Sequence, residues 1–243
     1  MANRHHHEIL ERIRSSAGKA TQHTFLDSYL GTTSPRYAIG IPALRKIAKN
    51  WMHDHPALGP SAVKAVVTAL MKGKSSTEKT MGGLLLDYTR PEQRQFDPVI
   101  FESWIGQLSG WAEVDALCSG KYTVTEVPAH AKVWARLLTH FSKSRNIHHR
   151  RASLVLLVAP LRNAENIPLA TIGLKNILRL KNEKEILITK AISWLLRTMI
   201  KKHNSLVREF MAAHGDELPA IAVRETMTKL KTGRKTKRRM VLL

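Results

Sequence analysis

The chain has 243 residues, 43% of them hydrophobic, and its 39 Lys and Arg against 19 Asp and Glu give a formal net charge of +20. This length and apolar content exclude a peptide and a generally disordered chain, and they allow one elongated domain or two small ones. The sequence contains no run of 18 apolar residues, and Met1–Arg14 lacks the apolar segment of a signal peptide. The single cysteine, Cys118, excludes a disulfide framework and a Cys-based zinc site within one chain, so we expect a cytoplasmic protein.

The basic charge predicts a polyanionic partner. With a pI near 10.4, the chain can neutralise phosphates and release their condensed counterions. A nucleic acid is therefore the favoured partner. An anionic membrane surface is the competing partner, and association with ribosomes or RNA in general is the least specific alternative.

Helical periodicity dominates the hydrophobic pattern. Its spacing predicts helices over Ala43–Trp51, Ala62–Met71, Val133–Phe141, Ala152–Ala159, Leu174–Leu180 and Glu185–Met199. Breaks rich in Gly and Pro separate these segments at intervals of one helix plus one short loop, which suggests about a dozen helices of ordinary length. Tyr122–Val127 is the only short strand candidate.

The predicted fold is an all-α solenoid of degenerate HEAT-like repeats with a concave basic face. A compact helical bundle is the alternative, but no single predicted helix is apolar all round, as a central bundle helix would be. We expect one repeat domain over residues 1–230 and a basic, flexible tail over 231–243.

Both ends of the chain are rich in basic residues. Cations between Lys229 and Arg239 predict an arm that adds non-specific phosphate affinity, with a merely solvated terminus as the alternative. His5–His7 could bind a metal, but a His cluster near a terminus is more often surface decoration, and we expect neither a metal nor a cofactor.

An aromatic residue and an acid share one face in the segment Trp111-Ala112-Glu113-Val114-Asp115. Trp111 and Asp115 are separated by four residues, and the preceding Gly110 fits a helix start. Asp115 is an unusual acid in so basic a chain. An ordinary ion pair with a neighbouring Arg is the structural alternative.

Cations cluster in the segment Asn146–Ala152, where Arg150 and Arg151 precede the predicted helix Ala152–Ala159. A helix start offers free N–H groups and a positive dipole end, so this segment is a candidate phosphate site. A solvated basic turn is the alternative.

A third candidate site consists of Lys190, Trp194, Arg197 and Lys201, whose spacings of 4, 3 and 4 put them on one helical face. Trp194 is rotated roughly 200° from the apolar Ile192, so it is predicted to face away from the core. A Trp between cations suggests a platform for a base or sugar, with the cations on phosphates. The alternative is a partly buried Trp that contacts the next repeat.

Together the three sites fit the cleavage of an N-glycosidic bond in a cationic nucleotide. Alkylation makes the base a good leaving group, so no acid is needed, and positive charge develops on the sugar. A carboxylate can stabilise that charge and orient water, while aromatic faces hold the sugar.

The sequence resembles the DNA alkylation repair enzyme family, the AlkD type of HEAT-like-repeat DNA glycosylase, from about Tyr29 to Leu230. Trp111–Asp115 resembles W-D-x-V-D, NIHHRRAS resembles N-I-x-x-x-R-A-A, and KAISWLLR resembles K-A-I-G-W-x-L-R. Ala222–Glu225, expected just ahead of a helix, resembles the last repeat of the family. KAISWLLR is the most specific of these motifs.

The resemblance implies a role for each matching residue. Asp115 takes the place of the catalytic carboxylate, Trp111 and Trp194 those of the residues that cradle the sugar, and Arg151 that of the arginine on the neighbouring phosphate. Tyr29 is a candidate DNA contact. We assign DNA binding to Lys190, Arg197, Lys201, Arg150 and Tyr29. Known members excise 3-methyladenine and 7-methylguanine without base flipping, which implies double-stranded DNA as the partner, no deep base pocket and no metal. We expect a monomer, because a solenoid with a DNA groove needs no partner subunit.

One departure from the family concerns its first acid, which is replaced by Ala112. Glu113 lies about 100° further round the helix and cannot simply replace it. The family also contains relatives that bind DNA without excising bases, so a binding protein for bent or branched DNA is the alternative function. A helical-repeat protein for RNA or acidic proteins is a third. No lysine stands out as a Schiff-base nucleophile, so we expect no strand cleavage.

Overall fold

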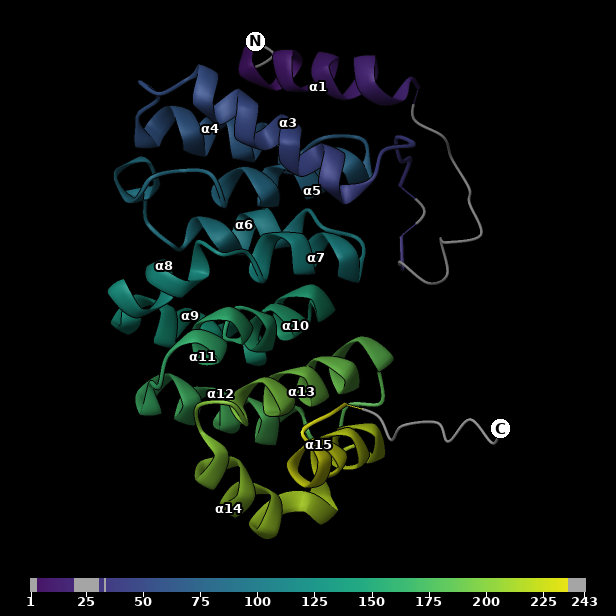
Figure 1. The fold of residues 1–243 in the computed structure, drawn as a ribbon, viewed down its shortest axis with the longest axis vertical. Helices are drawn as coiled ribbons and strands as arrows, with labels where there is room; N and C mark the ends of the chain where they lie inside the picture. Colours follow the sequence, from purple (N-terminus) through teal and green to yellow (C-terminus); the bar gives the residue numbers. More distant parts are fainter. Residues whose placement is uncertain (1–3, 20–30, 33, 236–243) are drawn as a thin grey trace. The chain divides into compact units, whose positions relative to one another are not determined.

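The computed structural model describes residues 4–19, 31–32 and 34–235, which form two compact units that divide at Glu126 and Val127. Each unit is built from short helices joined by short connections (Figure 1). Tyr29, a predicted DNA contact, lies outside the described residues. None of the described helices is long and apolar enough to cross a membrane.

The first unit contains helices that follow one another in chain order, and α8 spans the boundary with the second unit. They are α1 (Arg4–Ala17), α3 (Ile41–Asp54), α4 (Pro60–Met71), α5 (Ser76–Leu86), the 3-10 helix η1 (Pro91–Arg94), α6 (Ile100–Gly106), α7 (Trp111–Cys118) and α8 (Thr123–Ala129). Local sequence sets the helix starts. Proline occupies the first turn of α3 and α4. Ser75 and Glu78 form a capping box at the start of α5.

Helix α5 is the central element of this unit, because it packs against α3, α4 and α7. Most of its residues are buried, including Ser76, Thr77 and Glu78. Two glycines allow this close packing. A Cβ at Gly82 would come within 2.8 Å of Met71 Cε, and one at Gly83 within 2.6 Å of the Ala116 backbone in α7. Helix α5 is therefore buried on nearly all sides although many of its own residues are small or polar. The spacing of apolar residues alone does not predict this burial.

The second unit contains α9 (Ala131–Ser142), α10 (Ile147–Val155), α11 (Val158–Asn163), α12 (Ile167–Leu180), α13 (Ile186–Met199), α14 (Asn204–His214), the 3-10 helix η2 (Gly215–Glu217) and α15 (Ala220–Thr232). Helix α13 packs against α10, α11, α12, α14 and α15. Fully buried Asn176 ties α12 to its neighbours by donating to the carbonyls of Leu138 in α9 and Ser153 in α10, at 3.2 and 3.3 Å. Polar and apolar contacts thus fix the helices that carry the candidate site.

The predicted all-α class is confirmed for the described residues, and the packing of helices on their neighbours in sequence is consistent with a solenoid. The concave basic face and the boundary between residues 230 and 231 stay predictions. Helix α15 continues to Thr232.

Three local predictions were wrong. Tyr122–Val127 does not form a strand, because all of it except Tyr122 belongs to α8, a helix that also contains Pro128. Ala152–Ala159 is divided between α10 and α11. Ala222–Glu225 lies inside α15 rather than ahead of a helix. Helical hydrogen bonds, such as those from the Glu126 N–H to the Tyr122 carbonyl and from the Val223 N–H to the Pro219 carbonyl, account for the first and third differences.

Candidate functional site

Trp111 and Asp115 lie on α7 in the first unit, where both side chains are half-buried. Trp111 is the first helical residue and follows Gly110 as N-cap, as the sequence predicted. Two residues from much earlier in the chain lie against the start of this helix. The hydroxyls of Thr32 and Ser34 are 3.0 and 3.2 Å from Ser109 Oγ. The four-residue spacing therefore places an aromatic ring and a carboxylate one turn apart on a fixed helix.

Glu113, which sequence reasoning set aside, is fully buried and stabilises the start of α7. Its Oε2 accepts a 2.8 Å hydrogen bond from the Ser109 backbone N–H. Lys79 Nζ of α5 lies 4.0 Å from the same oxygen. An acid near the first turn of a helix also interacts favourably with the helix dipole. Glu113 thus positions the helix that carries Trp111 and Asp115, while Ala112 remains half-buried beside it.

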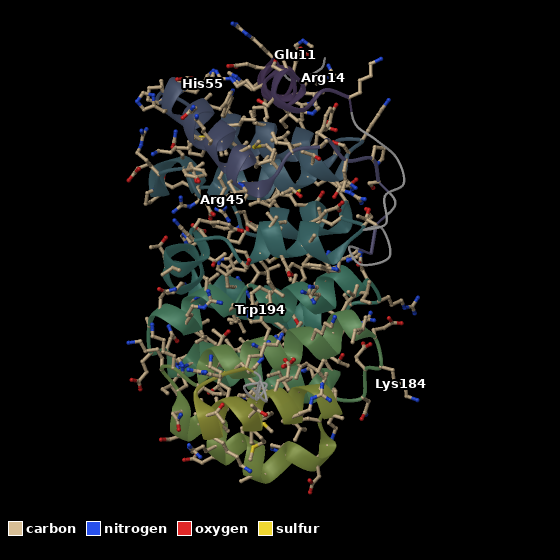
Figure 2. The ribbon with its side chains drawn as sticks, turned by 45° about the vertical axis from the view of Figure 1, so that its right-hand side comes forward. Glu11, Arg14, Arg45, His55, Lys184 and Trp194 are labelled. Atoms are coloured by element: carbon tan, nitrogen blue, oxygen red, sulfur yellow. The ribbon has the colours of Figure 1, made fainter. Side chains whose placement is uncertain are left out.

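A pocket in the second unit brings together four of the predicted site residues. It has a volume of about 300 Å³ and is lined by Arg151, Lys190, Trp194, Arg197, Ile221, Glu225 and Lys235. Lys190, Trp194 and Arg197 come from successive turns of α13, as their spacing predicted. Trp194, labelled in Figure 2, is half-buried, so it has both a packed side and an accessible one. The pocket combines an aromatic surface with cations, which suits an anionic ligand that carries flat groups.

A polar network in this pocket connects α13 to α15. Ser193 Oγ donates a 2.6 Å hydrogen bond to Glu225 Oε2 and accepts a 3.1 Å hydrogen bond from Arg197 Nε. Arg197 Nε lies 3.2 Å from Glu225 Oε2, and Lys235 Nζ lies 3.5 Å from Glu225 Oε1. Burial alone would raise the pKa of Glu225, but the Ser193 hydroxyl, Arg197 and Lys235 outweigh it and lower the pKa. Glu225 is therefore ionised at neutral pH and holds Arg197 in place.

Sequence reasoning missed Ser193 and assigned Glu225 no role. Ser193 stands where the motif that KAISWLLR resembles has a glycine. That difference, together with an acid within the basic C-terminal segment, was the available signal. It could not be interpreted without knowing that α13 and α15 pack together.

Lys229 lies one turn beyond Glu225 on α15. Burial lowers the pKa of its amine, and the nearby cations Arg197 and Arg162 lower the pKa further. The sequence singled out no lysine as a Schiff-base nucleophile, and it could not reveal the surroundings of Lys229, because these depend on how α15 packs against other helices.

The remaining predicted residues have different surroundings. Arg151 is nearly buried and donates to the Leu187 carbonyl at the start of α13. Arg150 forms a 2.6 Å ion pair with Glu183 and donates to the carbonyls of Ser144 and Arg145.

Neither arginine lies at the start of its helix, although the predicted phosphate site was based on such a position. Helix α10 begins at Ile147 with Asn146 as its N-cap, because the Asn146 side chain accepts from the His148 N–H at 2.8 Å. Apolar spacing did not predict this start, because the first turn of α10 consists mostly of polar residues.

Lys201, predicted on one helical face with Lys190, Trp194 and Arg197, lies beyond the end of α13, and its role in DNA binding stays a prediction. Helix α13 ends at Met199, so Lys201 lies exposed in the turn that follows. It does not line the pocket.

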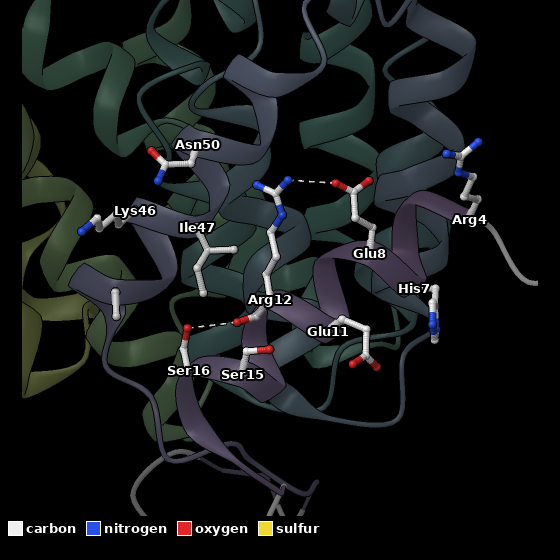
Figure 3. A pocket seen from close by; sticks show the side chains of 11 residues that line it. Arg4, His7, Glu8, Glu11, Arg12, Ser15, Ser16, Lys46, Ile47 and Asn50 are labelled. Carbon is white, nitrogen blue, oxygen red and sulfur yellow. Dashed lines mark hydrogen bonds and ion pairs between the residues drawn. The ribbon is translucent and has the colours of Figure 1, made fainter.

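A second cavity, of about 830 Å³, lies between α1 and α3 in the first unit (Figure 3). Among the residues that the structure describes, none of those predicted to be catalytic or to bind DNA lines it. Its polar lining comprises Arg4, His7, Glu8, Glu11, Arg12, Ser15, Ser16, Lys46 and Asn50.

Comparison with known proteins identifies one family. Residues 9–230 match the model of the family described as DNA alkylation repair enzyme. A solved structure of a protein from Enterococcus faecalis, described as a predicted DNA alkylation repair enzyme, is similar with a TM-score of 0.66 and 20% identity, over 85% of this chain and 93% of that one. No curated protein sequence gives a significant match. The structural similarity, at this identity, concerns the fold.

Proposed function

Because the chain belongs to the DNA alkylation repair enzyme family, we propose that it is a monofunctional DNA glycosylase for cationic alkylated purines. Its substrates are double-stranded DNA that contains 3-methyladenine or 7-methylguanine, and its reaction is hydrolysis of the N-glycosidic bond, the first step of base excision repair. The protein acts as a monomer without a cofactor and is associated with the cytoplasmic nucleoid.

The pocket around Trp194 is the observation that carries this proposal. A half-buried Trp with Lys190 and Arg197 on adjacent turns offers a surface for a sugar between sites for phosphates. Glu225 and Ser193 hold Arg197 in one orientation. A glycosylase needs such an anchored sugar-phosphate backbone, because the lesion must be positioned before the bond breaks.

The proposed chemistry assigns the charge-stabilising role to Asp115. The bond between C1′ and the base nitrogen breaks with its electron pair going to the cationic base, which leaves neutral. The carboxylate of Asp115 stabilises the positive charge that develops on the sugar. Water then bonds to C1′ and loses a proton to Asp115 or solvent. Trp111 and Trp194 hold the electron-poor sugar.

Excision without base flipping follows from this chemistry in our proposal. A base that already carries a positive charge needs neither a protonating acid nor a pocket that recognises its edge. The residues proposed here contact the sugar and phosphates, so the base can stay in the duplex.

A panel of lesions tests the proposal. Duplexes that each contain one 7-methylguanine, 3-methyladenine or uracil are incubated with excess protein, and the free base and strand length are measured separately. We expect release of the two cationic bases, retention of the neutral uracil, and an intact strand at the abasic product. Release of uracil at a similar rate would contradict the proposed dependence on a cationic leaving group.

A binding protein for bent or branched DNA is the second candidate, and it is favoured by one observation. Ala112 replaces the first acid of the family motif, and the neighbouring Glu113 is buried and bound to the Ser109 backbone. Tight DNA binding without release of any base in the lesion panel would support this candidate and overturn the glycosylase.

A further inference from the structure

Three potential metal ligands converge in the first unit, where the first turns of α1 meet the end of α3. His5 and Glu8 lie on adjacent turns of α1, and His55 is the C-cap residue of α3. One ligand atom from each side chain lies within 4.8 Å of those of the other two. His55 Nε2 is 3.2 Å and His5 Nδ1 is 3.8 Å from the same oxygen, Glu8 Oε2.

These separations fit a four-coordinate ion. Zinc bonds to His nitrogen and carboxylate oxygen at about 2.0–2.2 Å, so neighbouring ligand atoms of a tetrahedral site lie about 3.3 Å apart. The distance from Glu8 Oε2 to His55 Nε2, 3.2 Å, is close to this separation. The distance from Glu8 Oε2 to His5 Nδ1, 3.8 Å, is slightly longer. All three side chains are between 21% and 33% exposed, so an ion and a water ligand can reach them.

Hydrogen bonds to the other polar atoms of His55 and Glu8 leave the proposed ligand atoms able to bind a metal ion. The Trp51 carbonyl lies 2.8 Å from His55 Nδ1 and can only accept, so Nδ1 donates and the lone pair of a neutral ring stays on Nε2. Arg12 Nη2 donates to Glu8 Oε1 at 2.9 Å and leaves Oε2 directed at the histidines. This ion pair appears as a dashed line in Figure 3. Such outer partners typically orient metal ligands.

Ring packing also fixes the two histidines. The His55 ring stacks on Trp51 with centroids 4.3 Å apart, and the His5 ring meets the edges of Trp51 and His55 at 5.5 and 5.1 Å. Trp51 is fully buried in the core of the unit. The cluster is therefore held by the fold and not only by attraction between His and Glu.

We propose that His5, Glu8 and His55 form a site for one divalent transition-metal ion, with Zn²⁺ as the expected ion and water as the fourth ligand. The ion cross-links α1 to the end of α3. Of the three consecutive histidines, only His5 takes part. His6 lies 2.8 Å from Glu78 Oε1, and His7 is exposed.

Zinc titration of untagged, chelator-treated full-length protein tests the site, with His5→Gln and Glu8→Gln as ligand variants. The matched control is His7→Gln, which removes an exposed neighbouring histidine. We expect one Zn²⁺ per chain for the wild type and the control, measured by calorimetry. Since loss of an outer-shell partner alone costs about 10–100-fold in metal affinity, each ligand variant should lose at least that much.

Two further readouts concern coordination and stability. Co²⁺ in place of Zn²⁺ should give the intense visible bands of a four-coordinate ion in the wild type and the control only. Zn²⁺ at about 100 times its Kd should raise the Tm by ~5–10 °C and slow hydrogen exchange in α1. Circular dichroism of the metal-free variants verifies folding, and if one ligand variant unfolds, the other decides.

Absence of one-to-one binding by the wild type would overturn the proposal, as would ligand variants that bind Zn²⁺ as tightly as the wild type. Either result would mean that the contacts among His5, Glu8 and His55 hold α1 against α3 without a metal ion. None of these readouts depends on DNA or on base excision, so the proposed metal site and the proposed function can fail separately.

Discussion

The carboxylate of Glu225 lies among cations at the mouth of the pocket in the second unit, and it is the residue that most directly controls Arg197. It accepts from Ser193 and pairs with both Arg197 and Lys235. Its lowered pKa keeps it ionised at the pH at which DNA binds. A DNA phosphate must therefore compete with Glu225 for these two cations.

Replacement of Glu225 should strengthen non-specific DNA binding. In Glu225→Gln the cations are released for phosphates, so the affinity for undamaged duplex should rise several-fold. The slope of log K against log salt should become steeper by up to about 0.9 per additional phosphate contact. Fluorescence anisotropy over a series of salt concentrations measures both quantities.

Glu217→Gln is the matched control, because it also removes one charge but breaks an exposed ion pair with Lys181. It should leave the salt slope close to that of the wild type. An identical response of the two variants would show that overall charge, and not competition within the pocket, governs binding.

At the residue scale, the sequence predicted the helical positions of the acidic and aromatic candidate residues. Helical spacing was enough to place Trp111 and Asp115 one turn apart on α7 and Trp194 beside Lys190 and Arg197 on α13, whereas their proposed roles stay predictions. Ser193 and Glu225 could not be predicted in the same way, because their contact joins residues 32 positions apart. Such a contact depends on how α13 and α15 pack, which no local pattern encodes.

At the scale of elements, the position of α7 depends on one glycine of α5, Gly83. Gly83 lets α5 approach the Ala116 backbone of α7 so closely that a Cβ would lie 2.6 Å away. Lys79 of the same helix reaches Glu113. The element that carries Trp111 and Asp115 is thus positioned by a helix without any predicted site residue.

A methyl group at Gly83 should therefore displace α7. Because the contact is with backbone and not with a flexible side-chain end, we expect Gly83→Ala to destabilise the protein by about 1–3 kcal/mol. Chemical denaturation checks this value. Gly106→Ala is the control, since a Cβ at this helical glycine would meet no atom within 4 Å. Equal stability of both variants and the wild type would refute the close packing.

Helix boundaries were the least predictable feature at this scale. Apolar spacing located α3, α4, α9, α12 and α13, whose buried stripes are regular. It misplaced the start of α10, because Asn146 caps a first turn of polar residues. It also suggested a strand over Tyr122–Val127, most of which belongs to α8, a helix with Pro128 near its end. Capping and proline position set these boundaries, and both act through the backbone.

At the scale of the whole molecule, the net charge of +20 and the family agree on DNA as the partner. Charge alone did not distinguish DNA from RNA or from an anionic membrane, whereas the match over residues 9–230 indicates DNA repair. Salt-dependent affinity is expected of a glycosylase and of a binding protein, because both neutralise phosphates. Only a measurement of chemistry separates these two functions.

The most direct test is the release of 7-methylguanine from a duplex under single-turnover conditions by the wild type and by Asp115→Asn. We predict that the wild type frees the base and that the variant does so about 10²–10³-fold more slowly, because it lacks the charge that stabilises the sugar cation. Both should bind the duplex with similar affinity, and Asp216→Asn, which changes an exposed acid, should resemble the wild type. Equal rates for wild type and Asp115→Asn, or DNA binding without any release of base, would contradict the proposed mechanism.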